Sequence, residues 1–466
     1  MTHVGRLADR ADRRRTDRGA GGRPGVIART WASLKLLVAV VLSPPGSALV
    51  AWRAARNHLH AKQTMEALPG VIARLSSGRS GGALGRVATI DASTPLVVTS
   101  DLHRCSAGRV DLVGAQDNRD LYVAMLDWYA TTNTTLVENG DVEDFWMVGG
   151  SAWGSAYDLL RLGGAALVGR LGDGLRQATY REQLRRIVAN NAAIYQQIQS
   201  HFAAAGRYHR TVGNHDDVFA DERLTAALSE HVGPVVMSDW IVLRSGDEVE
   251  AIILHGHVAD GWNGPGRSTL GKLSSWMADL LKDAPIPVTP DDLPSPTRTR
   301  ELLSSRRRNG LLRVSPRFGA SSAYDSLDEE LLFDALGGAA TVGPWILMGH
   351  THFPVLQPAS DTGARWWRYA NSGHGLGAGL VTAIEWPGDD PAPRSPRLVA
   401  WVWADHPDWM DLVGSEATTH HQGRPVARIE LTPSPDGRRL HAVRERAKGA
   451  RAEPDTLRGR RTGSWW

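Results

Sequence analysis

The sequence predicts an α/β layered fold, in which short buried strands alternate with helices. Three observations support this prediction. Short apolar runs recur along the chain, and each ends in a polar or glycine-containing cluster, as buried strands with functional loops at their ends do. A stretch with helical periodicity lies between the second and third runs. After Ala364 the pattern changes to tryptophan-rich segments with strand character.

Each of these elements can be assigned to residues. The early apolar runs are predicted as buried strands at Pro95–Thr99, Thr134–Val137, Tyr208–Val212, Ala251–Leu254 and Trp345–Met348. The helical stretch places apolar side chains on one face that would pack on a sheet, namely Leu184, Ile187, Ile194, Ile198 and Phe202. The late strands should pair antiparallel and complete a sandwich, and they are Arg365–Tyr369, Val381–Trp386, Leu398–Trp403 and Val426–Leu431.

The composition is that of a soluble globular protein. Of the 466 residues, 42% are hydrophobic and 22% are charged, which excludes a chain that is disordered throughout. The net charge of +3 is small and its basic excess lies at the two ends, so no nucleic-acid partner is expected. The single cysteine, Cys105, cannot form an internal disulfide, which favours a reducing compartment. We expect a cytoplasmic protein that is peripheral to a membrane if its N-terminal arm binds lipid.

Residues 1–80 form a basic arm with a possible membrane-peripheral helical segment. Eight arginines fall within the first thirty residues, and the apolar run Leu36–Leu42 that follows is too short to span a bilayer. One interpretation is a segment that lies on an anionic membrane surface through its arginines. The other is a disordered arm that leads into a first buried helix. The run is followed by no convincing cleavage site, which disfavours a signal peptide.

The remainder divides into a main domain and a tail. A Gly/Ser-rich stretch ends near Arg86, so we expect the main domain to span residues 86–436. Within it, residues 261–343 form a long excursion between two candidate ligand segments, and we expect an inserted cap that selects substrate. A flexible loop without substrate contact is the alternative. Residues 437–466 are basic, lack apolar periodicity and are expected to be disordered.

Two acidic segments follow the first two predicted strands. Asp101 and His103 in the segment SDLH can turn to one side at the end of the strand, which suits a metal site. Asp-x-His alone is a weak signal. In GDVED, the carboxylate of Asp141 is suited to bridge two cations about 3.5–4 Å apart, because a shared carboxylate offsets their repulsion.

The segment GNHD follows the third predicted strand and offers two different functions. Asn214 can give a neutral amide oxygen to a metal ion. His215 can act as an electrophile or as the general acid for a departing oxygen, a role that needs a side chain able to carry a proton, as an imidazole can. Asp144 is the candidate to orient His215.

Two further segments, LHGH and GHTH, add histidines after apolar runs. His255 is a candidate ligand, and His350 and His352 can serve two adjacent cations because residues i and i+2 of an extended stretch face the same way. His257 is left as a contact to substrate or to a ligand. A lone histidine is usually an ordinary polar residue, but five glycine-punctuated strand ends in one chain favour a metal site.

The series SDLH, GDVED, GNHD, LHGH and GHTH resembles the motifs of the calcineurin-like metallophosphoesterases, over about Leu96–Gly373. The resemblance implies a four-layer sandwich of two mixed β-sheets flanked by helices, with residues 261–343 as the inserted cap. It also implies two divalent metal ions, manganese first, with iron or zinc as alternatives. By motif, one ion would take Asp101, His103 and His352, the other Asn214, His255 and His350, and Asp141 would bridge them.

The resemblance implies hydrolysis of a phosphate ester or pyrophosphate, in which a metal-bridging hydroxide attacks phosphorus directly. The substrate would be a phosphorylated small molecule or a lipid-linked one. GDVEDFW, GHTHFP and the later YANSG are similar to the UDP-2,3-diacylglucosamine pyrophosphatase branch. His215 departs from that branch, which usually has arginine there, so its lipid substrate is not carried over.

Some assignments stay open at the level of the sequence. Arg104, Arg368 and His374 are candidates for phosphate contact or for ordinary structural roles. A different class of function is a membrane-peripheral binding or scaffold protein that uses the same fold, which would be expected to have lost ligands. All seven ligand types and the proposed acid are present, which favours an enzyme.

Overall fold

The computed structural model covers residues 1–466. It describes residues 67–77, 85–107, 111–115, 117–146, 169–259, 343–352, 354–357, 368–376, 379–391, 394–406, 418–433 and 440–443, together with positions 52, 56, 59, 63, 64, 148, 263 and 264. Almost all of the expected cap at 261–343, and most of the basic arm and tail, therefore lie outside the described residues.

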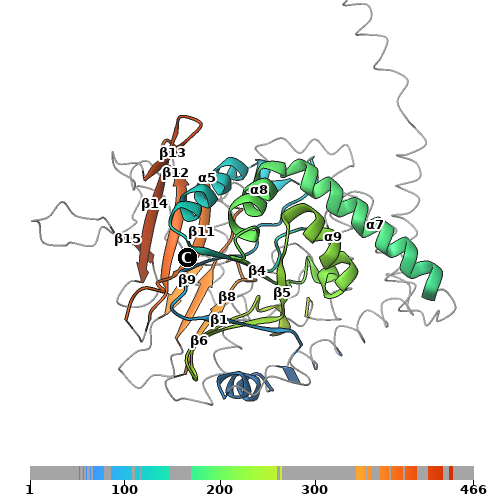
Figure 1. Cartoon of the computed structure of the whole chain (residues 1–466), viewed down its shortest axis with the longest axis horizontal. Helices are drawn as coiled ribbons and strands as arrows, with labels where there is room; N and C mark the ends of the chain where they lie inside the picture. The colour runs from blue at the N-terminus through green and yellow to red at the C-terminus, as the bar shows by residue number, and fades with distance from the viewer. Residues whose placement is uncertain are drawn as a thin grey trace, which may run out of the picture.

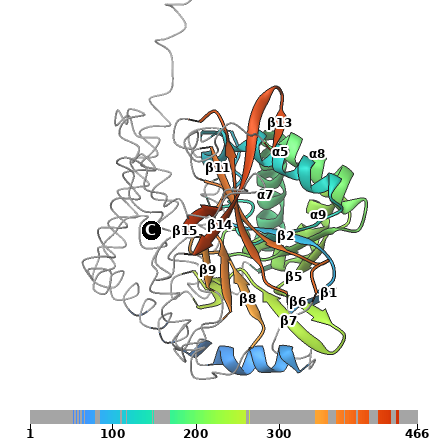
Figure 2. The same cartoon turned by 90° about the vertical axis from the view of Figure 1, so that its left-hand side faces the viewer.

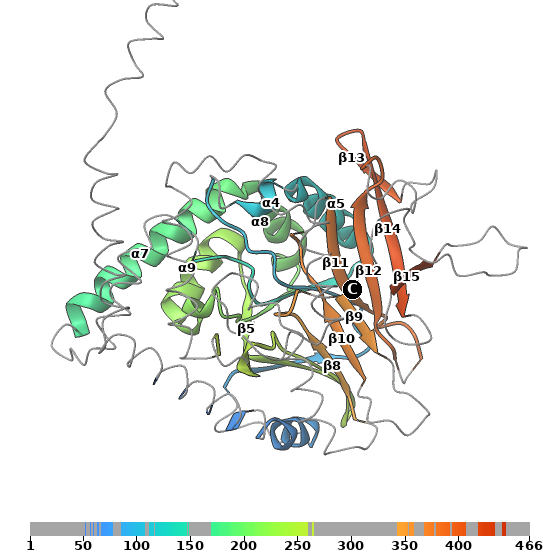
Figure 3. The same cartoon turned by 180° about the vertical axis from the view of Figure 1, so that it is seen from behind.

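The larger sheet has nine strands and is mixed. Its order is β13 (Thr419–His421), β14 (Arg424–Pro433), β12 (Arg397–Trp403), β11 (Leu380–Trp386), β2 (Leu96–Thr99), β3 (Thr135–Asn139), β4 (Tyr208–Thr211) and β5 (Val236–Ser238), with β15 (Leu440–Val443) also paired to β14. From β2 to β5 the strands are parallel, and from β11 onward the pairs are antiparallel. Figure 3 shows β5 and the late strands on opposite sides of the view.

The smaller sheet has six strands and is also mixed. Its order is β1 (Val87–Asp91), β6 (Trp240–Ser245), β7 (Glu248–Ile253), β8 (Trp345–Met348), β10 (Tyr369–Ser372) and β9 (Pro354–Gln357). β1–β6, β7–β8 and β8–β10 are parallel pairs, and β6–β7 and β9–β10 are antiparallel. Two mixed sheets with helices make an α+β fold, which confirms the general class predicted from the sequence.

Helices cover the outer face of the larger sheet. They are α5 (Asn118–Thr131), α7 (Gly169–Asn190), α8 (Ala192–Gln197), the π-helix η2 (Ile198–Ala203) and α9 (Glu222–Val232) (Figure 1). Shorter elements are α4 (Leu112–Ala115), η3 (Asp217–Ala220) and η4 (His257–Ala259). The predicted apolar face is confirmed, because its side chains are all buried in one core with the sheet, namely Leu184, Ile187, Ile194, Ile198 and Phe202.

Two further cores separate the remaining layers. Side chains alternate along a strand, so Val97 faces the helices while Leu96 and Val98 face the smaller sheet. On the far side of the smaller sheet, Leu68 and Ile72 of the helix over residues 67–76 are buried against it. Figure 2 shows this blue helix at the foot of the molecule. The helix lies before the composition boundary near residue 86, so the folded body begins earlier than that boundary.

Two predicted segments differ in the structure. Of the strand expected at Arg365–Tyr369, residues 365–367 lie outside the described residues, and the described strand, β10, begins at Tyr369 and ends at Ser372. The tail expected to be disordered from residue 437 contains β15, which pairs antiparallel with β14. Four residues are too few to give a readable strand period, and the pairing comes from the neighbouring strand. Among the described residues, no helix is long and apolar enough to cross a membrane.

A buried network of ion pairs lies beneath the ends of β2, β3 and β4. Arg104 pairs with Glu138, and Arg210 donates to Glu143 at 2.5 and 3.1 Å. Arg210 also donates to Asp216 at 3.1 Å. All five side chains are fully buried. Their positions on successive segments mean that the network fixes the loops that follow the strands.

Tyrosine hydroxyls and backbone N–H groups satisfy the remaining carboxylate oxygens of this network. Tyr122 and Tyr208 donate to Glu138 at 2.9 and 2.6 Å, and Tyr195 donates to Glu143 at 2.6 Å. The backbone N–H groups of Val142 and Gly213 donate to the two oxygens of Asp216 at 3.0 and 2.6 Å. Asp216 thus joins the second and third ligand segments directly.

We expect Arg210→Met to destabilise the protein strongly. It removes the cation shared by Glu143 and Asp216 and leaves buried carboxylates uncompensated, which costs about 3–5 kcal/mol. The matched control is Arg397→Met, whose partner Asp390 is exposed, and it should cost at most about 1 kcal/mol. Urea unfolding of both variants measures the difference, and equal midpoints would contradict a structural role for the network.

Candidate metal centre

Five loops at the ends of strands from both sheets meet at one place. They follow β2, β3 and β4 in the larger sheet and β7 and β8 in the smaller one. The backbone N–H of His103 donates to the carbonyl of Asp141 at 2.9 Å, and that of Gly349 donates to the carbonyl of His255 at 3.1 Å. The N–H of His350 donates to Asp101 Oδ2 at 2.8 Å, which ties the two sheets together. The five motif segments of the sequence therefore form one site.

The backbone of this site is held in an unfavourable conformation. Asp101, His103, Asp141, His350 and His352 all have positive φ angles, of 53°, 45°, 51°, 70° and 60°. They are five of the eight non-glycine residues with positive φ among those the structure describes. Residues other than glycine seldom adopt this region, and such strain concentrates at functional sites. The loops therefore keep a strained backbone that directs the candidate ligand side chains toward one another.

Glycines allow these loops to approach one another. A side chain at Gly213 would place its Cβ 2.2 Å from Asp141 Oδ1, and one at Gly349 would place it 2.7 Å from Asp101 Oδ2. Either substitution would displace a candidate ligand. This is the physical reason for glycine before the ligand residues in both GNHD and GHTH.

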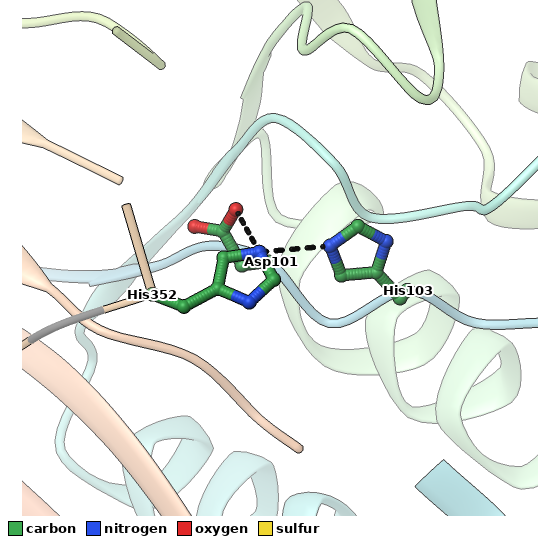
Figure 4. A group of neighbouring side chains, drawn as sticks. All are labelled: Asp101, His103 and His352. Carbon is green, nitrogen blue, oxygen red and sulfur yellow. Dashed lines mark hydrogen bonds and ion pairs between the residues drawn. The ribbon is translucent and has the colours of Figure 1, made fainter. Parts of the chain in front are cut away.

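Asp101, His103 and His352 form the first group of candidate ligands (Figure 4). His352 Nε2 lies 3.1 Å from Asp101 Oδ1 and 3.1 Å from His103 Nε2. Burial lowers the pKa of His352, so its ring favours the neutral form. Asp101 Oδ1 is buried, and the close contact to it is the one from His352 Nε2. Two imidazole nitrogens and a carboxylate oxygen thus converge where a cation would satisfy all three.

Asp141, His255 and His350 form the second group, with Asn214 beside it. His255 Nδ1 lies 2.8 Å from the carbonyl oxygen of Asn139 and donates its proton there. His255 Nε2 then faces Asp141 Oδ2 and Asn214 Oδ1, each at 3.3 Å. A nitrogen lone pair opposite two oxygens is unfavourable unless a proton or a metal ion lies between them.

Asp141 lies between the two groups. Its Oδ2 is 3.3 Å from His255 Nε2 in the second group and 3.9 Å from His103 Nε2 in the first. Its Oδ1 accepts a hydrogen bond from the backbone N–H of His215 at 2.8 Å, which fixes the carboxylate plane. This placement suits a carboxylate shared by two cations.

Asp144 holds two histidines with its two oxygens. Its Oδ1 is 3.0 Å from His215 Nδ1, and its Oδ2 is 3.1 Å from His103 Nδ1. Trp146 stacks on the His215 ring with centroids 3.9 Å apart and an interplanar angle of 23°. The backbone N–H of Trp146 donates to Asp144 Oδ1 at 3.0 Å. His215 is therefore fixed from its edge and from one face.

The electrostatics of the site favour cations. Burial opposes the charged form of His103, but its hydrogen bond to Asp144 and the charges of Asp144, Asp141 and Asp101 raise its pKa to about 9. Burial also opposes the charged form of His255, and Asp141 raises the pKa of that histidine to about 10. The carboxylates thus attract positive charge, which divalent ions supply more fully than protons do. A mixed set of imidazole, carboxylate and amide donors could hold divalent metal ions.

The structure brings together all seven candidate ligands and the pair His215–Asp144. It also adds residues whose position the sequence did not reveal. His257 lies with its ring centroid 5.3 Å from that of His255, and His374 lies 5.9 Å from His352. Arg104 is excluded as a phosphate contact, because it is fully buried against Glu138.

The network residues Glu143, Arg210 and Asp216 had no assigned role in the sequence analysis. Glu143 lies inside the motif GDVED, and this was the only indication in the sequence that Glu143 belongs to the site. Arg210 lies inside a predicted strand, where a buried arginine gives no pattern.

No protein-family model matches the chain, and no match is found among curated proteins.

We expect the purified protein to bind two manganese ions per chain. Asp141→Asn removes the negative charge that lies between the two groups. It should raise the apparent Kd for manganese by at least about tenfold, since even mutation of a residue that only orients a metal ligand costs about 10–100-fold in metal affinity. Asp390→Asn changes an exposed carboxylate far from the site and serves as the control. Equilibrium dialysis with metal analysis measures both, and two tightly bound ions in Asp141→Asn would refute the shared position.

Proposed function

We propose that the chain is a hydrolase of the calcineurin-like metallophosphoesterase type, which cleaves a phosphate ester or pyrophosphate bond. The observation that carries the proposal is the sharing of Asp141 between two groups of ligand side chains, with His215 fixed beside them. A general acid next to a pair of cation sites is the arrangement that hydrolysis of a phosphorus ester needs.

In this proposal, the side chains that hold the metal ions are the two groups of neighbouring ligand residues described above. Asp101, His103 and His352 would hold one divalent ion, Asn214, His255 and His350 would hold the other, and Asp141, which lies between the two groups, would be available to both. When bound, two divalent ions, manganese or alternatively iron or zinc, would acidify water and offset negative charge on phosphoryl oxygens. The fixed loops keep the ligand atoms in place before substrate arrives.

His215 gives a proton to the departing oxygen in this proposal. Its side chain is 17% exposed, so it is accessible to a substrate from solvent. With Nδ1 held by Asp144, the opposite nitrogen, Nε2, is directed away from that carboxylate and can carry the transferred proton. Trp146 prevents the ring from rotating, and this fixes the direction of proton transfer.

The substrate class in this proposal is a phosphorylated small molecule or a lipid-linked one. Both contain the phosphoryl group that the ions and His215 would act upon. The residues expected to select between them are those of the cap at 261–343.

A membrane-peripheral role is the second candidate, and it has its own observation. Trp52 and Leu59 are 52% and 54% exposed, and the Arg56 guanidinium lies 5.4 Å from the Trp52 ring centroid. Exposed tryptophan and leucine with nearby arginine suit the interface of an anionic bilayer. Such binding would locate the enzyme at a membrane without taking part in hydrolysis.

We expect the manganese-loaded protein to hydrolyse at least one of p-nitrophenyl phosphate, bis-p-nitrophenyl phosphate and a nucleotide-sugar pyrophosphate. His215→Ala should lower kcat by about 10²–10⁴-fold through loss of the general acid while both ions stay bound. The control is His201→Ala, an exposed histidine of η2, with unchanged kcat. Loss of metal in His215→Ala would instead place that residue among the ligands.

The membrane role is tested by deleting residues 1–50, which leaves the packed helix over residues 67–76 intact. Sedimentation with phosphatidylserine vesicles should decrease while hydrolysis of soluble substrates is unchanged. The double variant Trp52→Ser with Leu59→Ser should weaken sedimentation in the full chain as well. Equal sedimentation of the parent, the deletion variant and the double variant would rule out a role of residues 1–59 in membrane binding.

A further inference from the structure

His374 is a histidine beside the candidate metal centre that belongs to neither ligand group. It follows β10 and Gly373, whose φ of 75° turns the chain toward the site. Its ring centroid is 5.9 Å from that of His352, and the N–H of the next residue, Gly375, donates to the carbonyl of Asp101 at 3.3 Å. His374 is thus attached to the first ligand group through both backbone and ring contacts.

The backbone of His374 is fixed by one buried residue of β11. The N–H of His374 donates to Thr382 Oγ1 at 3.0 Å, and the N–H of Thr382 donates to the carbonyl of His374 at 3.2 Å. Thr382 is 2% exposed. These two hydrogen bonds fix the position of the His374 Cα and the direction of its Cα–Cβ bond.

The protonation of the ring is fixed as well. The backbone N–H of Leu376 donates to His374 Nδ1 at 2.9 Å. A ring nitrogen that accepts a hydrogen bond carries no proton, so the proton of neutral His374 is on Nε2. Because the two nitrogens lie on different edges of the ring, the Nε2–H group is directed away from the turn that Leu376 closes.

This tautomer makes His374 a hydrogen-bond donor rather than a metal ligand. Nδ1 is occupied by the backbone, and Nε2 carries its proton, so neither nitrogen offers a lone pair to an ion. The side chain is partly exposed, in contrast to the buried ligand His350. A fixed neutral N–H donor at the edge of a metal site suits an anionic oxygen.

His374 also lies at the end of a series of ring contacts. The ring centroids of His215 and His103 are 4.5 Å apart, those of His103 and His352 are 5.0 Å apart, and those of His352 and His374 are 5.9 Å apart. The terminal members of the series are His215 and His374, which belong to neither of the two proposed ligand groups. His215 and His374 each lie one ring contact from a member of the first ligand group, where a phosphoryl group would bind.

We propose that His374 binds a phosphoryl oxygen of the substrate, and of product phosphate, through its Nε2–H group. The inference rests on the proposed function, because it places a phosphoryl group at the metal centre. Arg104, which follows His103 in the sequence, is committed to Glu138 and cannot take this role. His374 thus supplies a fixed contact of the kind that an arginine often makes with phosphate.

Two substitutions separate this role from a structural one. In His374→Asn, the amide oxygen can still accept from the N–H of Leu376, as in an Asx turn, but the outward donor is lost. In His374→Gln, the longer side chain can place its amide N–H near the position of Nε2, but the contact with Leu376 is lost. A phosphate-binding role predicts that Asn is harmful and Gln is tolerated, while a purely structural role predicts the reverse.

The measurement is calorimetric titration of the manganese-loaded full-length protein with inorganic phosphate. We expect His374→Asn to weaken phosphate binding about tenfold or more, as loss of a hydrogen bond to a charged group does, and His374→Gln to remain within about threefold of the parent. Both variants should keep two ions and the thermal unfolding midpoint of the parent. In turnover, the Asn variant should show a raised KM.

The inference is overturned unless His374→Asn binds phosphate more weakly than His374→Gln. It is also overturned if the manganese-loaded parent binds no phosphate at all. A parent that binds phosphate with this dependence on residue 374 but hydrolyses none of the esters would refute the proposed function and leave the phosphate contact standing.

Discussion

The site depends on one constraint, which is that each buried carboxylate needs a positive charge or a hydrogen-bond donor beside it. Beneath the loops, the carboxylates Glu138, Glu143 and Asp216 are paired with two buried arginines, and these ion pairs hold the strand ends together. Above them, Asp101 and Asp141 face histidines. The positions of the arginines therefore determine where negative charge is left over. In the proposed function, this excess of carboxylate would attract the metal ions to the loops, while the ion pairs beneath them hold the loops in place.

Much of this arrangement could be read from the sequence. The carboxyl ends of neighbouring parallel strands meet at one edge, so Asp101, Asp141 and Asn214 could be placed together from their positions after apolar runs. The histidines of the smaller sheet were identified in the same way. The apolar stripe that begins with Leu184 predicted the helical layer, because burial on one face leaves a period of 3.6 residues.

Other parts could not be read, for physical reasons. Arg210 and Glu143 are stabilised by one another across strands, and a long-range ion pair leaves no local pattern. The helix over residues 67–76 follows an arginine-rich arm, and only its contact with the smaller sheet reveals that Leu68 and Ile72 are core residues. β15 is too short to show alternation. The role of His374 depends on a tautomer, which requires the position of the Leu376 N–H group.

The two oxygens of Asp144 have a consequence for how this site can change. One oxygen holds His103, a candidate ligand, and the other holds His215, the candidate acid. A shift of the carboxylate that follows a change of metal ion would therefore move the acid as well. Ion size and the reach of the acid toward the leaving group are mechanically coupled through a single side chain. If the proposed function holds, a change of bound metal would therefore also change which leaving groups His215 can reach.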